Sequence, residues 1–112
     1  QQISEKSSVQ MAIQIIEDEY KNDVSLGEVS ERLGMSLQYL SKQFKEETGI
    51  NFKEYLTKYK IEHAKQLLLS GNDTVEYIAK NVGYNNSLQL VRMFKKMENI
   101  TPTEYRHRNK KR

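Results

Sequence analysis

The chain has 112 residues, a net charge of +3, two histidines and no cysteine. This length suffices for one domain with a single core, and the lack of cysteine excludes disulfides, thiolate zinc sites and cysteine nucleophiles. The chain has no apolar run of about 18 residues that could span a membrane, and one proline, five glycines and no strand-like alternation favour an all-α fold.

Three helices are predicted in the first half of the chain. Serines stand at their starts, Ser7 or Ser8 for the first, where a side-chain oxygen can cap free backbone N–H groups. Ser25 and Glu28 have the spacing of a capping box, and glycines that tolerate positive φ follow the second and third helices. The predicted spans, with their caps, are about 8–20, 25–33 and 36–48, followed by Gly34 and Gly49 after the last two.

Four helices are predicted in the second half. The longest begins at Asn51 and is broken by Ser70-Gly71-Asn72. The later starts are Asp73-Thr-Val-Glu76, Asn86 with Gln89 at the capping-box position, and Thr101-Pro102-Thr-Glu104. The predicted spans are about 51–70, 73–82, 86–97 and 101 onward, with residues 106–112 expected to fray.

The sequence contains one unit twice. Residues 29–34 align with 78–83 at an offset of 49, and one inserted residue near Asn85 makes the later offset 50. The later pairs are Leu40/Leu90, Phe44/Phe94, Lys45/Lys95, Ile50/Ile100, Glu54/Glu104 and Tyr55/Tyr105, whose apolar members are expected in the core. Two helices joined by a short turn containing glycine are typical of a helix-turn-helix, although helical hairpins used only for packing share this pattern.

The second helix of each unit has two contrasting faces at 100° per residue. The residues expected to point inward are Leu37, Leu40 and Phe44 in the first copy, and Leu90 and Phe94 in the second. The opposite face carries Gln38, Lys42 and Lys45, with Ser41 at its edge, and then Leu88, Arg92, Lys95 and Lys96, with Val91 at its edge. Amides, hydroxyls and cations near the start of a helix favour a helix that reads the DNA major groove.

The helix between the units is about 18 residues, or roughly 27 Å long. One turn of B-DNA is roughly 34 Å, so a rigid helix of this length can hold two reading helices about one turn apart. Its residues expected to pack inward are Phe52, Leu56, Tyr59, Ile61, Ala64 and Leu68, and its expected surface lysines are Lys53, Lys58, Lys60 and Lys65.

Charge is divided unevenly along the chain. Residues 1–50 hold five Lys and Arg against nine Asp and Glu, a net −4, whereas residues 51–112 hold thirteen against six, a net +7. A basic C-terminal half suits a polyanionic partner. An ordinary solvated surface with a basic tail has the same charges, so charge alone leaves both interpretations open.

These features together resemble the DNA-binding domain of the AraC/XylS family of bacterial transcriptional regulators, over about residues 8–108. The matching positions in the second half are Lys60-Ile61-x-x-Ala64, Ile78-Ala79, Gly83-Tyr84, Leu90, Arg92, Phe94-Lys95-Lys96 and Thr101-Pro102-x-Glu104-Tyr105-Arg106. The first unit matches through Tyr39-Leu40-Ser41-Lys42-x-Phe44-Lys45-x-Glu47-Thr48-Gly49. The expected architecture is one all-α, seven-helix domain over 1–112, made of a first unit 8–50, a linker helix 51–70, a second unit 73–108 and a basic tail 109–112.

The resemblance implies that each unit places a recognition helix in successive major-groove segments of double-stranded DNA. The implied base-reading residues are Gln38, Ser41, Lys42, Ser87, Leu88, Val91 and Arg92. The residues expected at phosphates are Lys45, Lys95, Lys96 and Arg106. The chain departs from the family pattern at Asn99, where glycine is common but Asn also visits the αL conformation, and at Leu88 and Val91, which replace commonly polar residues.

Leu88 therefore has three interpretations. It belongs to the core if the helix start is misplaced, it contacts a partner protein, or it meets thymine methyl groups together with Val91. The third is favoured, and because apolar contacts offer no bidentate hydrogen bonds, the second unit is then expected to discriminate bases less sharply than the first.

No catalytic, metal or cofactor site is expected, and the chain is not expected to be an enzyme. Glu17–Glu19 is an acidic run expected to be solvated, and His63 has no second histidine four residues away. The expected partners are double-stranded DNA and either RNA polymerase or another domain of a longer parent chain. The missing initiator Met also indicates that the chain is part of a longer one. Neither a membrane nor a small-molecule site is expected. The expected location is the cytoplasm, in association with the nucleoid. A helical protein-interaction module is the alternative class, and its binding would depend far less on salt than DNA binding does.

Overall fold

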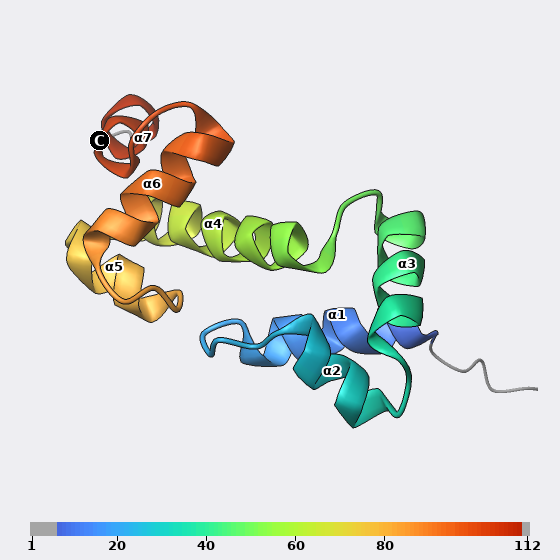
Figure 1. Cartoon of the computed structure of the whole chain (residues 1–112). Coiled ribbons are helices and arrows are strands. Elements are labelled where there is room, and N and C mark those ends of the chain that lie inside the picture. The colour runs from blue at the N-terminus through green and yellow to red at the C-terminus, as the bar shows by residue number, and fades with distance from the viewer. Residues whose placement is uncertain (1–6, 111–112) are drawn as a thin grey trace, which may run out of the picture. The chain divides into compact units, whose positions relative to one another are not determined.

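A computed structural model describes residues 7–110, which form seven helices and no strand (Figure 1). The helices are α1 (Ser8–Glu19), α2 (Leu26–Leu33), α3 (Leu37–Thr48), α4 (Phe52–Ser70), α5 (Val75–Asn81), α6 (Ser87–Glu98) and α7 (Pro102–Asn109). The predicted all-α class and order of helices are thus confirmed for this part of the chain. None of these helices is long and apolar enough to cross a membrane.

The chain divides into two compact units within α4. Unit 1 comprises residues 1–56, with α1, α2, α3 and the start of α4, and unit 2 comprises residues 57–112, with the rest of α4 and α5 to α7. Each unit therefore holds one copy of the sequence repeat and its own set of buried apolar residues.

Side-chain oxygens cap the helix starts, as the sequence predicts. The Ser7 hydroxyl accepts from the backbone N–H of Gln10 at 3.0 Å, and the Gln10 side chain accepts from the Ser7 N–H at 2.8 Å. Thr101 and Glu104 form the same reciprocal pair before α7. These caps satisfy backbone donors that the first turn of a helix leaves free.

Two predicted caps differ in detail. Thr74, not Asp73, caps α5 by accepting from the Tyr77 N–H at 3.0 Å. The capping box at Ser25 forms only half: Ser25 accepts from the Glu28 N–H, but the Glu28 carboxylate accepts from Arg32 at 3.1 Å. A cation one turn along the helix offers a charge-assisted bond, which is stronger than one to a neutral N–H.

Helix ends follow the repeat. Gly49 ends α3 at φ 88°, and its counterpart Asn99 ends α6 at φ 68°. Both adopt the left-handed conformation, which glycine enters without strain and asparagine enters more readily than most residues. The expectation that Asn99 substitutes for the glycine common in the family is confirmed.

The core of unit 1 is built on Phe44. Its ring lies 5.5 Å from Phe52 and 5.3 Å from Tyr55, both edge-to-face, so α3 packs on the first turn of α4. The other fully buried residues come from α1, α2 and α3: Ala12, Ile16, Val29 and Leu40. The predicted core pair Leu40 and Phe44 is therefore confirmed.

The core of unit 2 repeats this plan around Phe94. Its ring lies 5.5 Å from Tyr105 of α7, edge-to-face, as Phe44 lies against Tyr55. The other fully buried residues are Ile61, Ala64 and Leu68 of α4, Ile78 and Ala79 of α5, Val82, Leu90 and Pro102. The same apolar positions thus serve both copies, as the repeat predicts.

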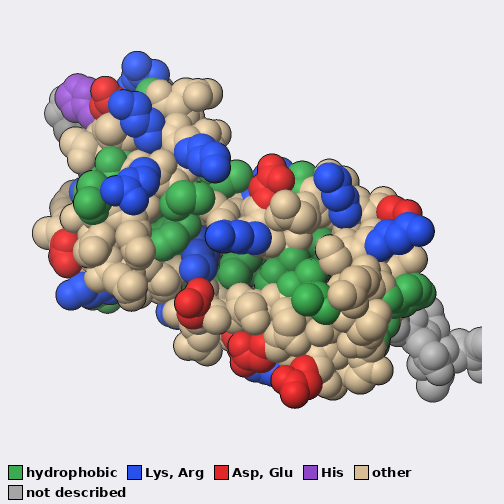
Figure 2. All heavy atoms as spheres, in the orientation of Figure 1, with side chains coloured by type: hydrophobic (Ala, Val, Ile, Leu, Met, Phe, Trp, Pro, Cys, Tyr) green, Lys and Arg blue, Asp and Glu red, His purple; other side chains and the backbone are tan. Residues whose placement is uncertain are grey.

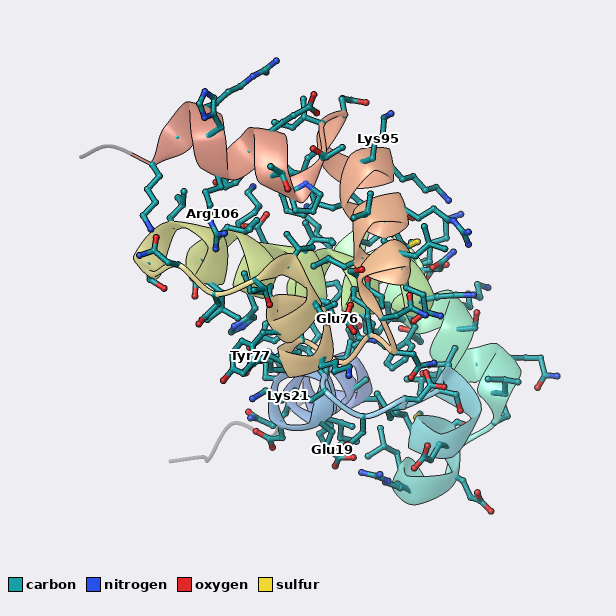
Figure 3. All side chains as sticks on the ribbon, turned by 90° about the vertical axis from the view of Figure 1, so that its left-hand side faces the viewer. Glu19, Lys21, Glu76, Tyr77, Lys95 and Arg106 are labelled. Carbon is teal, nitrogen blue, oxygen red and sulfur yellow. The ribbon has the colours of Figure 1, made fainter. Side chains whose placement is uncertain are left out.

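The end of α7 does not fray within the described residues. Arg106 donates from Nε to the Leu68 carbonyl at 2.9 Å and from Nη2 to the Asp73 carbonyl at 2.7 Å (Figure 3). Lys110 donates from Nζ to the Gly71 carbonyl and to Asn72 Oδ1. Helix α7 consequently runs to Asn109, and the prediction of fraying from residue 106 is wrong, because Arg106 and Lys110 bond the last turn of α4 and the turn after it. Lys111 and Arg112 lie outside the described residues.

Two lysines expected on the surface of α4 instead contact other side chains of unit 2. Lys60 is only 7% exposed, and its Nζ lies 4.8 Å from the centre of the Tyr84 ring. Lys65 lies 3.3 Å from Glu98 and 3.2 Å from Glu62. Burial also raises the pKa of the Tyr84 hydroxyl to about 12. These lysines hold α4 to its neighbours, because a partly buried cation is tolerated where an aromatic face or a carboxylate compensates it.

Candidate nucleic-acid interface

Each unit contains a helix-turn-helix with matching turn geometry. In unit 1, Gly34 follows α2 at φ 69° and the Met35 N–H donates to the Ser30 carbonyl at 3.0 Å. In unit 2, Gly83 follows α5 at φ 98° and the Tyr84 N–H donates to the Ala79 carbonyl at 2.8 Å. This pairing across a left-handed glycine closes the first helix and starts the turn toward the second.

The polar face of α3 is exposed. Gln38, Ser41, Lys42 and Lys45 all point away from the core, while Leu40 and Phe44 are completely buried. The structure therefore brings together on one face the four residues that the sequence singles out in the first unit. An amide, a hydroxyl and two ammonium groups lie within three turns of helix.

One residue of α3 contradicts the helical-wheel prediction. Leu37, expected in the core, is 44% exposed, and its neighbour Tyr39 is 53% exposed. Leu37 is the first residue of α3, directly after the N-cap Ser36, so it lies at the end of the face that packs on the core. The repeat carries a signal for this, because Leu37 aligns with the polar residue Ser87.

The outward face of α6 is more cationic. Leu88, Arg92, Lys95 and Lys96 are exposed, whereas Ser87 and Val91 are half-buried. Among the described residues, Arg92, Lys95 and Lys96 form no ion pair. Figure 3 shows Lys95 projecting outward from α6. Figure 2 shows Lys and Arg side chains gathered over the α6 and α7 end of unit 2.

Leu88 is 60% exposed, which excludes its interpretation as a core residue. We expect Leu88→Ser to change the free energy of unfolding by no more than about 0.5 kcal/mol, since exposed substitutions rarely do more. Chemical denaturation of the two proteins measures this difference, with Leu90→Ser, in the core of the same helix, as the destabilised control. A loss above about 2 kcal/mol for Leu88→Ser would show that the side chain packs more than its exposure indicates.

The start of α6 is fixed by a contact that sequence inspection missed. Glu76 of α5 accepts from the Ser87 N–H at 3.3 Å, and Gln89 accepts from the Asn85 N–H at 2.9 Å. The Asn86 side chain meanwhile accepts from the Gln89 N–H. Three hydrogen bonds thus fix the first turn of α6. Glu76 carries no signal in the sequence, because its target lies eleven residues away on the next helix.

Arg106 does not join the outward cationic face. Its guanidinium is half-buried and donates to two backbone carbonyls, so it ends α4 and fixes the turn before α5. These hydrogen bonds give Arg106 a structural role, and its contact with phosphate stays a prediction. A planar guanidinium suits this role because its several N–H groups can reach two carbonyls at once.

No cluster of three or more potential metal ligands occurs among the described residues. His63 lies against the ring of Tyr59 in α4, at 4.6 Å between ring centres, and His107 is exposed on α7. The exposed side chains on the outward faces of α3 and α6 offer hydrogen-bonding groups and positive charge.

A helix-turn-helix domain family model matches residues 29–108, most of the chain. The uncharacterized HTH-type transcriptional regulator YtdP of Bacillus subtilis is 40% identical over 98 residues, which cover 88% of this chain. The uncharacterized HTH-type transcriptional regulator SAS0078 of Staphylococcus aureus is 36% identical over 106 residues, or 95% of this chain. This chain spans only 13% and 14% of the lengths of these two relatives.

Solved structures share the fold. The C-terminal domain of AraT, a response regulator from Geobacillus stearothermophilus, is 35% identical with a TM-score of 0.91, covering 96% of this chain and 89% of that one. The C-terminal domain of the two-component response regulator yesN from Fusobacterium nucleatum is 38% identical with a TM-score of 0.81, covering 86% and 94%. The chain therefore belongs to the AraC/XylS family of bacterial transcriptional regulators, as a DNA-binding domain of that family.

Proposed function

We propose that this chain binds double-stranded DNA in a sequence-specific manner and thereby regulates transcription. One observation carries the proposal: two copies of a helix-turn-helix expose the equivalent face of their second helices, and both faces carry cations. An exposed helix with hydrogen-bonding tips and cations fits the major groove, where each base pair presents a distinct pattern of donors and acceptors.

The proposed base-reading residues differ between the two helices. Those of α3 are polar, and their groups suit adenine through an amide or guanine through an ammonium. Those of α6 include an arginine for guanine and apolar side chains for thymine methyl groups. They are Gln38, Ser41 and Lys42 of α3, and Ser87, Leu88, Val91 and Arg92 of α6. Because Ser87 and Val91 are half-buried, Leu88 and Arg92 are expected to carry most of the reading by α6.

The proposed phosphate contacts are Lys45 of α3 with Lys95 and Lys96 of α6. All three are exposed and lie past the midpoint of their helices, further from the end that would enter the groove. Contacts to phosphate fix the protein on the duplex and carry no sequence information directly.

We expect Lys42→Ala and Arg92→Ala each to lose about 1–3 kcal/mol of binding free energy and to relax the preference at particular base pairs. Lys96→Ala should weaken binding to all sequences by a similar factor, because phosphates are common to every sequence. Titration of each variant against the preferred duplex and its single base-pair variants measures the difference. Equal losses for Lys42→Ala on preferred and unrelated DNA would contradict its base-reading role.

Selection from a pool of random duplexes tests the proposed function. A preferred site with two separated segments is the expected result, and binding to it should fall steeply with salt because bound cations release counterions from DNA. If no sequence is enriched and no duplex is bound at low salt, the proposed function fails. Binding to another protein with little salt dependence would instead favour the protein-interaction module.

We further propose that the chain acts as part of a longer protein at the bacterial chromosome in the cytoplasm. The supporting facts are its small share of the length of its curated relatives and its likeness to C-terminal domains of response regulators. In such a protein another domain would receive the signal. Contact with RNA polymerase stays a prediction.

A further inference from the structure

The internal repeat allows the two proposed reading helices to be compared position by position. Glu46 of α3 aligns with Lys96 of α6, and both are exposed. Each lies four residues after the cation proposed to read bases, Lys42 or Arg92, and hence one turn further on the same face. At one equivalent position of the proposed DNA-binding face, unit 1 therefore presents a carboxylate where unit 2 presents an ammonium group.

The remaining acidic groups increase this contrast. Helix α3 exposes a second carboxylate, Glu47, next to Glu46. The acidic residue of α6, Glu98, is turned toward α4, where it lies 3.3 Å from Lys65. Helix α6 consequently presents three cations and no exposed carboxylate, whereas the cations and carboxylates exposed on α3 balance.

The two units as wholes differ in the same direction. Residues 1–56 hold six Lys and Arg against ten Asp and Glu, a net −4, and residues 57–112 hold twelve against five, a net +7. In unit 1, Arg32 is also paired, at 2.6 Å from Glu19 and 3.1 Å from Glu28. Asp and Glu side chains lie over the α1 and α2 part of the surface (Figure 2).

Binding to DNA of unrelated sequence is almost entirely electrostatic, because it depends on neutralising phosphates. A unit with net negative charge and a carboxylate on its binding face gains little from such contacts. We infer that unit 2 alone holds the protein on DNA that lacks the site, and that Glu46 keeps unit 1 from engaging until its base contacts are available. On the preferred site, hydrogen bonds from Gln38, Ser41 and Lys42 offset the repulsion and unit 1 binds as well. This inference rests on the proposed function.

The matched pair Lys45→Ala and Lys95→Ala tests which unit contacts unrelated DNA, because the two lysines are equivalent in the repeat. Each variant is titrated against the selected duplex and against a shuffled duplex of the same composition. Lys95→Ala should weaken binding to both duplexes about fivefold, as expected for the loss of one phosphate contact. Lys45→Ala should weaken binding to the selected duplex by a similar factor, but to the shuffled duplex by less than about twofold.

A charge exchange at the aligned pair tests the role of Glu46 itself. Glu46→Lys should strengthen binding to shuffled DNA about tenfold, because unit 1 then binds without base contacts. The slope of log affinity against log salt concentration should also become steeper, by the amount that about one additional phosphate contact or more gives. Lys96→Glu should weaken binding to both duplexes. Glu17→Lys on α1 is the control for net charge, because it changes the charge of unit 1 by the same amount. At physiological salt a surface charge is largely screened beyond about 8 Å. Its effect on the affinity for shuffled DNA should therefore stay below about twofold.

Circular dichroism melting of each variant checks that the exposed substitutions leave the fold intact. Equal weakening of shuffled-DNA binding by Lys45→Ala and Lys95→Ala would overturn the inference, and so would equal effects of Glu46→Lys and Glu17→Lys. In both cases preferential binding to the selected duplex would remain, so the proposed function would stand. If the wild-type protein does not prefer the selected duplex over the shuffled one, it is the proposed function that fails.

Discussion

Inserting five base pairs between the two segments of the preferred site should lower the affinity about 100-fold or more. Five base pairs are half a helical turn, so the two segments would then face opposite sides of the duplex. Helix α4 connects the two helix-turn-helix units without a break over 19 residues. We predict that α4 acts as a rigid connection, because a continuous helix resists the twist that a flexible linker allows. One of the two proposed reading helices would then lose its base contacts, each worth about 1–3 kcal/mol.

Gel-shift or anisotropy titrations of the two duplexes measure this loss. Inserting the same five base pairs outside the site should change nothing and serves as the control for length. Equal affinity for the original and the internally lengthened site would contradict a rigid connection through α4. The result would then favour two units that bind independently.

Removing the ring of Phe94 should lower the free energy of unfolding by about 3–5 kcal/mol. Phe94 is completely buried and its ring lies edge-to-face on Tyr105, so Phe94→Ala leaves a cavity between α6 and α7. The loss is a large share of the roughly 5–15 kcal/mol that stabilises a typical domain. Because Phe94 also supports the helix that carries Arg92, DNA binding should fall with the folded fraction.

Urea denaturation measures the effect, and the repeat supplies a matched variant. Phe44→Ala removes the equivalent ring in unit 1, which contacts both Phe52 and Tyr55, and should cost as much or more. Leu88→Ala on the exposed face of α6 is the control and should change the free energy of unfolding little. A cost below about 1 kcal/mol for Phe94→Ala would mean that the site collapses around the missing ring.

The sequence alone determined the order of the helices, most of their caps and the residues at the centre of each unit. Caps such as Ser7 with Gln10 involve residues three positions apart, and the periodicity that buries Leu40 and Phe44 follows from the helix itself. Because the two copies align, the buried and exposed positions of one copy also predict those of the other. For these reasons the outward residues of α3 and most of those of α6 follow from the sequence.

The tertiary structure alone decided where several charged residues go. Lys60 was expected on the surface and is instead buried, with its ammonium group over the ring of Tyr84, a residue that lies far along the chain. Arg106 donates to carbonyls 33 and 38 residues earlier in the chain, and no local pattern predicts these contacts. Glu76 reaches the first residue of the next helix in the same way. A charged side chain is long and pairs with whatever the packing of distant helices brings near, and local sequence patterns do not contain that information.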